Sequence, residues 1–215
     1  MEIYQPFSVY TNLVKMLSYR GAILRGSVLT EDQLVERLNH YEFITLIADR
    51  TDTHILGKAI CYILLIKPGS KYSAKTSDFK KLLKEIPSNT LKNPQPIEVM
   101  FVSENVFTIH IKKALVAWKS ENHISGMYIE DHDYEKWYIE TPKHVSVPKH
   151  TIATPDEIAK FCALYYVSSP DKFPKILVND VQAVWLGLKP GMVCKIIRVS
   201  ESAGESIAYR YCIRG

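Results

Sequence analysis

The turn and cap signals between Lys143 and Gly215 constrain the fold of this chain more than any other feature of its sequence. Thr154-Pro155-Asp156-Glu157 places Thr at a helix N-cap, Pro at the first helical position and Glu three residues after the cap. Asp180 can cap a second, short helix to Leu186, and Gly187 suits its end because glycine tolerates a positive φ. We expect the first helix to carry an apolar stripe made of Ile158, Phe161, Cys162, Tyr165 and Tyr166.

The same part of the chain contains a predicted strand pair. Lys189-Pro190-Gly191 turns the chain into an apolar segment at 193–199, and Ala203-Gly204 precedes a second such segment at 207–213. Gly and Pro between two β-rich segments favour a hairpin. Residues 143–215 are therefore predicted to form a small α+β domain with a β-hairpin and short helices.

Residues 1–142 alternate between helical and strand patterns. Apolar residues recur at helical spacing over 8–20, and Thr30-Glu31-Asp32-Gln33 is a capping box that starts another helix. Segments rich in Ile, Leu and aromatic residues are predicted strands. They lie at 43–48, 59–67 and 97–102.

The remaining signals before Pro142 complete an α/β sheet domain. An amphipathic helix is predicted at 76–86. The segment 106–120 fits both periods, and we favour a helix because the pattern continues well past strand length. Short strands are expected at 127–130 and 137–139. The expected fold class is thus α/β, or α+β overall, with an N-terminal domain at 1–142 and a C-terminal domain at 143–215.

Composition is that of a globular protein. Hydrophobic residues make up 47% of the chain and charged residues 23%, so a packed core is expected. The longest apolar run, 59–66, is far too short to span a bilayer, and the first residues lack the pattern of a signal peptide. None of the four cysteines forms a CxxC pair, so we expect buried thiols in a reducing compartment. They are Cys61, Cys162, Cys194 and Cys212.

The net charge of +4 lies wholly in the C-terminal part. Residues 143–215 hold ten Lys and Arg against six Asp and Glu, so residues 1–142 are neutral. This excess indicates an acidic partner surface or nearby nucleic acid, although a mildly basic solvated surface would look the same.

The sequence offers no set of catalytic residues. No nucleotide-binding glycine motif is present. Asp131-His132-Asp133 is interpreted as a solvated loop. Glu98 could start a metal-dependent nuclease site, but no second acid lies two residues on and no Lys follows until Lys112. We therefore expect no catalysis, metal, cofactor, small-molecule substrate or membrane, with nuclease activity as a weak alternative.

Six short motifs in a fixed order resemble a known family. Their order is similar to the C-terminal domain of the fifth subunit of eukaryotic RNA polymerases, which polymerases I, II and III share; the corresponding archaeal RNA polymerase subunit is similar to this domain alone. The segment from Leu17 to Leu24, followed by the capped helix at Thr30, resembles the start of the family's N-terminal jaw domain. The motifs are Val147-Pro148-Lys149-His150, Pro174-Lys175-Ile176, Trp185 to Gly191, Ile196-Ile197-Arg198, Ser200-Glu201-Ser202 and Tyr209-Arg210.

The resemblance implies a non-catalytic role in transcription. The C-terminal domain would be an assembly domain that docks on the largest polymerase subunit, and the jaw would lie near downstream DNA. Lys195, Arg198 and Arg210 fall on adjacent strands of the predicted hairpin and could face a partner carboxylate together. The full set of expected docking residues is Pro148, Lys149, His150, Pro174, Lys175, Leu186, Gly187, Gly191, Lys195, Arg198, Ser200, Tyr209 and Arg210.

The sequence also departs from the family pattern. Cellular members carry a Thr-Pro-Ser-Ala loop in the jaw, whereas the corresponding stretch here, 103–108, has no proline. Ser103, Asn105 and Thr108 would be the DNA-proximal residues, with contacts to phosphates. This divergence suits a viral subunit in the host cytoplasm or virion; a cellular one would be nuclear. A stand-alone nucleic-acid-binding regulator stays open as an alternative.

Overall fold

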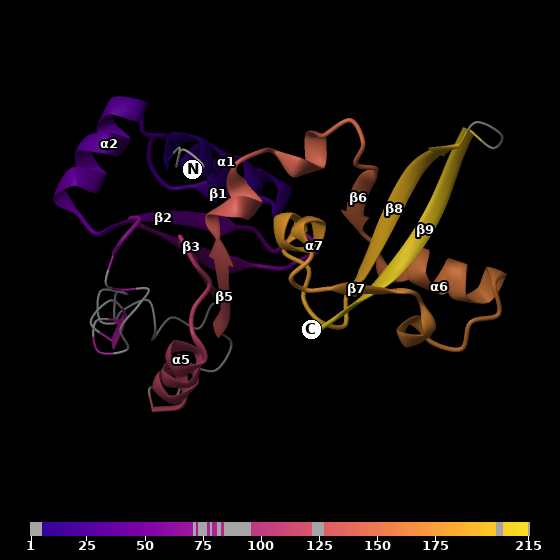
Figure 1. Ribbon diagram of the computed structural model, residues 1–215. Helices are drawn as coiled ribbons and strands as arrows, with labels where there is room; N and C mark the ends of the chain where they lie inside the picture. Colours follow the sequence, from indigo (N-terminus) through magenta and orange to yellow (C-terminus); the bar gives the residue numbers. More distant parts are fainter. Residues whose placement is uncertain are drawn as a thin grey trace. The chain divides into compact units, whose positions relative to one another are not determined.

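The computed structural model has an α+β fold that divides into two compact units, Met1–Ile139 and Glu140–Gly215 (Figure 1). It describes residues 6–70, 96–121, 127–200 and 204–214, together with Tyr72, Ser77, Phe79, Lys80 and Leu83. The boundary expected after Pro142 falls inside a 3₁₀ helix, Thr141–Lys143. No helix among the described residues is long and apolar enough to cross a membrane.

A mixed five-stranded sheet forms the centre of the N-terminal unit. Its order is β1-β2-β3-β4-β5. β2 pairs antiparallel with β1 and β3, whereas β4 pairs parallel with β3 and β5. Both long central strands, β3 and β4, are buried along their whole length, as expected for strands covered on both faces. The strands are β1 (Ala22–Leu24), β2 (Phe43–Arg50), β3 (Ala59–Ile66), β4 (Ile97–Ser103) and β5 (Met127–Asp133).

Helices cover both faces of this sheet. Met16 of α1 (Pro6–Tyr19) lines a small cavity with Ile63 and Met100 of the sheet. On the opposite face, Ile111 of α5 (Ile109–Glu121) joins a cluster with Phe79, Phe101 and Phe107. The helical interpretation of 106–120 is confirmed from Ile109 onwards, so the helix begins three residues later than predicted.

The second helix starts where the capping box predicts. Thr30 accepts the backbone N–H of Gln33 at 3.4 Å, and the Gln33 side chain accepts the Thr30 N–H at 3.1 Å, at the start of α2 (Glu31–His40). Of the helix predicted at 76–86, the described residues Ser77, Phe79, Lys80 and Leu83 are helical, and the others lie outside the described residues.

Buried ion pairs cross the α1 face of the sheet. Arg50 of β2 donates to both carboxylate oxygens of Glu98 on β4, at 2.6 and 2.9 Å. Arg20 holds Glu130 of β5 in the same way, at 2.9 and 3.1 Å. Burial opposes ionisation of Glu130, but the charge of Arg20 and a hydrogen bond with His132 lower its pKa below the usual range. Both carboxylate oxygens of Glu98 are thus engaged by a buried guanidinium.

Two predictions near the end of the N-terminal unit are wrong. Asp131-His132-Asp133 is part of β5, and His132 is 3% exposed, with its Nε2 atom 2.9 Å from Glu130. The strand expected at 137–139 is replaced by a 3₁₀ helix, Tyr134–Trp137, in which Trp137 is buried. In both places, burial against residues far away in sequence overrides the local pattern.

A four-stranded sheet with the order β6-β8-β9-β7 forms the C-terminal unit. The predicted hairpin is its centre, with β8 antiparallel to β9. β6 adds antiparallel to β8, and β7 adds parallel to β9. The strands are β6 (Lys149–Ile152), β7 (Lys175–Leu177), β8 (Val193–Ser200) and β9 (Gly204–Ile213).

The two predicted short helices lie on opposite faces of this sheet. Leu186 of α7 (Val181–Leu186) packs with Cys194 and Ile196 on one face. Phe161 of α6 (Pro155–Leu164) stacks on Tyr209 on the other, with ring centroids 4.4 Å apart. Both predicted caps are present, since Thr154 accepts from Glu157 N and Asp180 accepts from Gln182 N.

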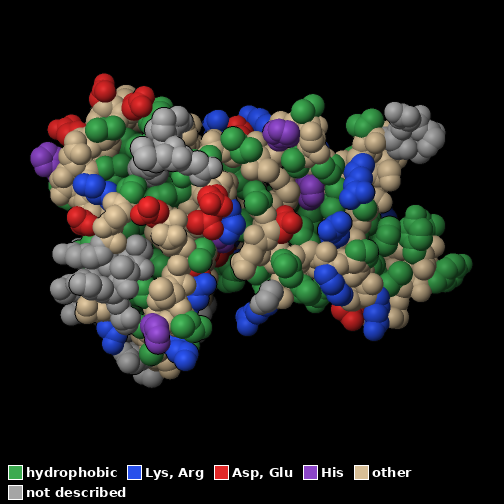
Figure 2. All heavy atoms as spheres, in the orientation of Figure 1, with side chains coloured by type: hydrophobic (Ala, Val, Ile, Leu, Met, Phe, Trp, Pro, Cys, Tyr) green, Lys and Arg blue, Asp and Glu red, His purple; other side chains and the backbone are tan. Residues whose placement is uncertain are grey.

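The predicted apolar stripe of α6 ends earlier than expected. Tyr166 has a left-handed φ of 54° and is 96% exposed, while Tyr165 is 60% exposed. The N–H of Val167 bonds to the carbonyl of Cys162 at 2.9 Å, the 6→1 bond of a Schellman turn, so the chain reverses before the tyrosines reach the core. Figure 2 shows hydrophobic side chains gathered near the end of α6.

Candidate docking surface

A groove of about 640 Å³ lies beside the outer half of β8. The β6–β8 ladder begins at the pair Lys149–Ile197, so Arg198, Val199 and Ser200 extend past the end of β6. The segment 145–148 runs alongside and forms the other wall. The groove thus brings together three predicted docking residues, Pro148, Lys149 and Arg198.

Apolar and charged groups are mixed on this groove. Val145 is 96% exposed and Val199 is 94% exposed, so two apolar side chains lie open to solvent on one groove. Lys149 and Arg198 are exposed, and Glu205 lies opposite Val199 in the hairpin register. Figure 2 shows Lys and Arg side chains over this sheet. Arg198 and Val199 are adjacent on β8 and point to opposite faces of the sheet, so the groove at this edge offers a cation on one side and an apolar group on the other.

The predicted triad of cations does not form. Side chains alternate along a strand, so Arg198 points to the α7 face of the sheet and Lys195 to the α6 face. Lys195 there donates to Glu157 at 2.6 Å. Arg210 shares the face of Arg198 but lies four positions away in the register, roughly 13 Å along the strands. One partner carboxylate therefore cannot reach all three cations. The prediction is wrong because successive side chains of a strand point to opposite faces of the sheet.

His150 lies opposite Ile196 in the β6–β8 ladder, on the α7 face of the sheet. Its Nδ1 atom lies 2.6 Å from the Pro148 carbonyl oxygen. Burial lowers the pKa of His150, and the positive charges of Arg210 and Arg198 lower it further, against the opposing effects of the Pro148 hydrogen bond and Asp180. The imidazole is therefore biased towards its neutral form.

Most of the other predicted docking residues lie in turns, in the core or in contacts within the unit. Gly187 ends α7 with a φ of 69°, and Gly191 turns the chain with a φ of 95°. The Pro174 carbonyl accepts the N–H of Tyr211 at 2.8 Å. Two more side chains, Leu186 and Tyr209, are buried, while Lys175 lies over the Tyr211 ring at 4.9 Å. The side chain of Ser200 lies outside the described residues.

The three predicted DNA-proximal residues differ in exposure. Ser103 is 2% exposed, and its hydroxyl donates to the Asn105 carbonyl at 2.6 Å. Asn105 and Thr108 are exposed, and the Thr108 hydroxyl accepts the N–H of Ile111 near the start of α5. Of these three residues, only Asn105 and Thr108 are thus exposed enough to contact DNA.

Among the described residues, no group of three His, Cys, Asp or Glu side chains could hold a metal ion.

The sequences of known proteins are similar to both units of this chain. The family described as RNA polymerase Rpb5, C-terminal domain, matches residues 139–212. A DNA-directed RNA polymerase RPB5 homolog of African swine fever virus is 25% identical over 206 residues, which covers 94% of this chain and 95% of that protein. A subunit rpabc1 of DNA-directed RNA polymerases I, II and III from Dictyostelium discoideum is 31% identical over 123 residues, covering 57% and 60%.

The archaeal relative identifies the family. The DNA-directed RNA polymerase subunit Rpo5 of Nitrosopumilus maritimus is 42% identical over 79 residues, which is 37% of this chain but 94% of that protein. These matches define an RNA polymerase subunit. The chain belongs to the Rpb5 family, the fifth subunits of multisubunit RNA polymerases.

Proposed function

We propose that this protein is a non-catalytic subunit that assembles through its C-terminal unit onto the largest subunit of its RNA polymerase. The observation that carries the proposal is the archaeal Rpo5 protein, 94% of which matches 79 residues of this chain, about the length of the C-terminal unit. This supports placing an interaction common to the whole family on the C-terminal unit.

The groove beside β8 supplies the chemistry for such docking. Exposed Val145 and Val199 give apolar area, while Lys149 and Arg198 can pair with an acidic side chain. Aliphatic groups surrounded by charges are typical of protein interfaces. Cys194 and Ile196, which precede the groove on the same strand, are buried in the core, so this strand is held by packing.

The experiment compares two charge reversals of the same kind. Arg198→Glu lies in the groove, and Lys160→Glu is the matched control on the exposed side of α6. Each tagged variant is used to purify the polymerase, and the recovered largest subunit is quantified by mass spectrometry. We expect Arg198→Glu to reduce recovery about tenfold, which corresponds to about 1.4 kcal/mol, and Lys160→Glu to leave it unchanged.

Thermal unfolding separates docking from folding. Both variants should unfold within about 2 °C of wild type, since both side chains are exposed. Equal recovery with the two variants would refute docking at the groove. Recovery of the wild-type protein without any polymerase subunit would refute assembly itself and favour a stand-alone nucleic-acid-binding regulator, which should show salt-dependent DNA affinity alone.

For the N-terminal unit we propose a jaw that lies near downstream DNA and contacts phosphates. The support is the resemblance to the family, together with exposed Asn105 and Thr108. Phosphate-to-protein crosslinking in a transcribing polymerase tests this. Crosslinks confined to the C-terminal unit would contradict it.

The match along nearly the whole length of the African swine fever virus protein supports a viral source, with the subunit in the host cytoplasm or virion, whereas a cellular subunit would be nuclear. The genes that surround this one decide the question. A complete set of cellular polymerase genes around it would rule out the viral assignment.

A further inference from the structure

Half of strand β2 has an open edge. β1 pairs only with the last three residues of β2, through the register Ala22–Arg50 to Leu24–Ala48. One further bond follows, from the N–H of Arg25 to the carbonyl of Ile47 at 2.7 Å, and the chain then leaves the strand. Within the described part of the chain, no strand pairs with residues 43–46 on this side.

Strand parity identifies the backbone groups on the open edge. The carbonyl of Ile47 points towards β1, and that of Glu42 points towards β3, where it accepts the N–H of Lys67 at 2.8 Å. Because successive residues of a strand alternate, the odd-numbered residues turn their N–H and C=O groups to the open side. Thr45 therefore presents both a donor and an acceptor there, as does Phe43.

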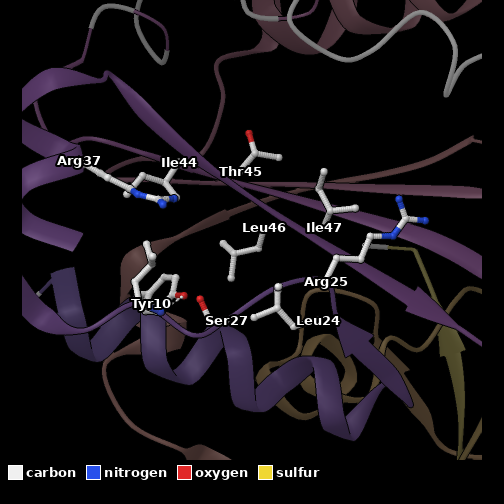
Figure 3. A pocket seen from close by; sticks show the side chains of 11 residues that line it. Tyr10, Leu24, Arg25, Ser27, Arg37, Ile44, Thr45, Leu46 and Ile47 are labelled. Atoms are coloured by element: carbon white, nitrogen blue, oxygen red, sulfur yellow. Dashed lines mark hydrogen bonds between the residues drawn. The ribbon is translucent and has the colours of Figure 1, made fainter. Parts of the chain in front are cut away.

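A cavity of about 330 Å³ lies along this edge (Figure 3). Four consecutive residues of β2, Ile44 to Ile47, form one wall, which is how a strand edge lines a groove. The segment 24–29 forms the opposite wall, and Tyr10 of α1 closes the floor. In Figure 3, the side chain of Arg37 reaches from α2 towards Ile44. The space is thus enclosed by polar backbone, apolar side chains and one end of an arginine.

The two arginines that line the cavity differ in whether they are paired with an acidic side chain. The Arg25 guanidinium is paired with Asp49 at 2.5 and 2.6 Å and points away from the cavity centre. The Tyr10 hydroxyl already accepts the N–H of Leu29 at 2.9 Å. Arg37 is exposed, and no ion pair is found for it among the described residues. The cavity therefore offers one cation together with the row of strand-edge groups.

We propose that this edge of β2 binds an extended segment of a partner protein as an added β-strand. Unpaired strand edges are templates for this mode, in which backbone hydrogen bonds give affinity and side-chain pockets give specificity. The segment pairs with Thr45, places apolar side chains beside Ile44 and Leu46, and carries an acidic side chain opposite Arg37. This site lies in the N-terminal unit and is independent of the docking groove beside β8.

The test uses a defined probe with the full-length protein. The probe is a fluorescent seven-residue peptide of alternating Val and Thr with one central Glu; a second peptide has Lys in place of Glu. Binding is measured by fluorescence polarisation, and amide hydrogen exchange locates the contact. We expect the Glu peptide to bind more tightly than the Lys peptide and to slow exchange at Thr45.

Two matched substitutions separate the backbone from the side chain. Thr45→Pro removes the N–H on the open edge without touching the β3 ladder, and proline is tolerated at such edge positions. Thr45→Val keeps that N–H and removes only the hydroxyl. We expect Thr45→Pro to weaken binding at least about tenfold and Thr45→Val to stay within about twofold of wild type. Arg37→Glu should reverse the preference between the two peptides.

Several outcomes would overturn the proposal. They are absence of binding to wild type, equal binding by Thr45→Pro, and protection confined to amides outside 43–47. Concentration-dependent dimerisation that Thr45→Pro abolishes would assign the edge to a second copy of this chain instead. Unfolding curves of both Thr45 variants must match wild type, so a loss of binding through misfolding is recognised as such.

Discussion

The two sheets of this protein are stabilised by different interactions. All charged side chains buried among the described residues belong to the N-terminal unit, where Arg50–Glu98 and Arg20–Glu130 cross the α1 face. The described core of the C-terminal unit is apolar except for Gln182, and its helices begin and end at strong local caps. The first unit therefore depends on long-range charge pairing, and the second on packing and turn chemistry.

The largest expected effect is a loss of stability that is confined to the N-terminal unit. Glu98→Ala leaves the Arg50 guanidinium buried without its carboxylate, which typically costs about 3–5 kcal/mol. Hydrogen exchange during urea unfolding should show earlier opening of β2–β5 and unchanged opening of β8–β9. An apolar double variant, Arg50→Met with Glu98→Leu, should recover most of the loss. Equal destabilisation by the single and double variants would contradict the charge argument.

Low pH should destabilise the N-terminal unit through the loss of its Arg20–Glu130 ion pair. Because the pKa of Glu130 is lowered in the folded protein, its ion pair stabilises the fold above the unfolded-state pKa of about 4.3. That contribution is lost progressively as the pH falls below this value towards the folded-state pKa. Urea midpoints at pH 7 and pH 3 should differ more for wild type than for Glu130→Gln. The same substitution at exposed Glu36 is the control and should change the pH dependence less.

Removal of a helix N-cap in the C-terminal unit should cause a smaller loss of stability. Asp180→Ala removes the carboxylate that accepts the N–H of Gln182 at 2.9 Å, and loss of an N-cap costs about 1 kcal/mol. Asp180→Asn keeps an acceptor and should be close to wild type. Amide hydrogen exchange of residues 181–186 measured along the unfolding curve reports on α7. A similar loss with both variants would mean that the charge of Asp180, and not its cap, matters.

The smallest change should stabilise the C-terminal unit. Tyr166 occupies the left-handed position of the Schellman turn that usually takes glycine, and its side chain is almost fully exposed. Tyr166→Gly relieves that strain and should raise stability by up to about 1 kcal/mol. Tyr166→Ala is the control, because it removes the ring but keeps the Cβ. If Ala stabilises as much as Gly, the strain account is wrong.

The contrast between the units also explains what the sequence could predict. Caps at Thr30, Thr154 and Asp180 are local signals, so the helix starts were predicted correctly. The pairing of Arg50 with Glu98 spans 48 residues and leaves no local pattern. For this reason the sequence could suggest a nuclease acid where the fold has a buried ion pair.

The predicted docking residues show the same difference between what the sequence indicates locally and what only the fold determines. Motif order identified the family and placed Pro148, Lys149 and Arg198 in one part of the chain, and the fold brings them to one groove. The orientation of Lys195 depends on strand parity, which the motif order does not carry. Exposed Val145 and Val199 were not predicted, because Val199 ends an apolar strand segment and nothing in the sequence marks either valine as exposed.

The burial of three thiols makes this subunit convenient for site-specific labelling. Burial raises the pKa of Cys61 and Cys194 to about 12 and that of Cys212 to about 11, so these thiols are protonated near neutral pH. Maleimides react with thiolates on accessible sulfur, and Cys162 on α6 is the half-buried thiol. A single fluorophore can thus be attached to α6 in the native sequence and used to measure distances inside an assembled polymerase.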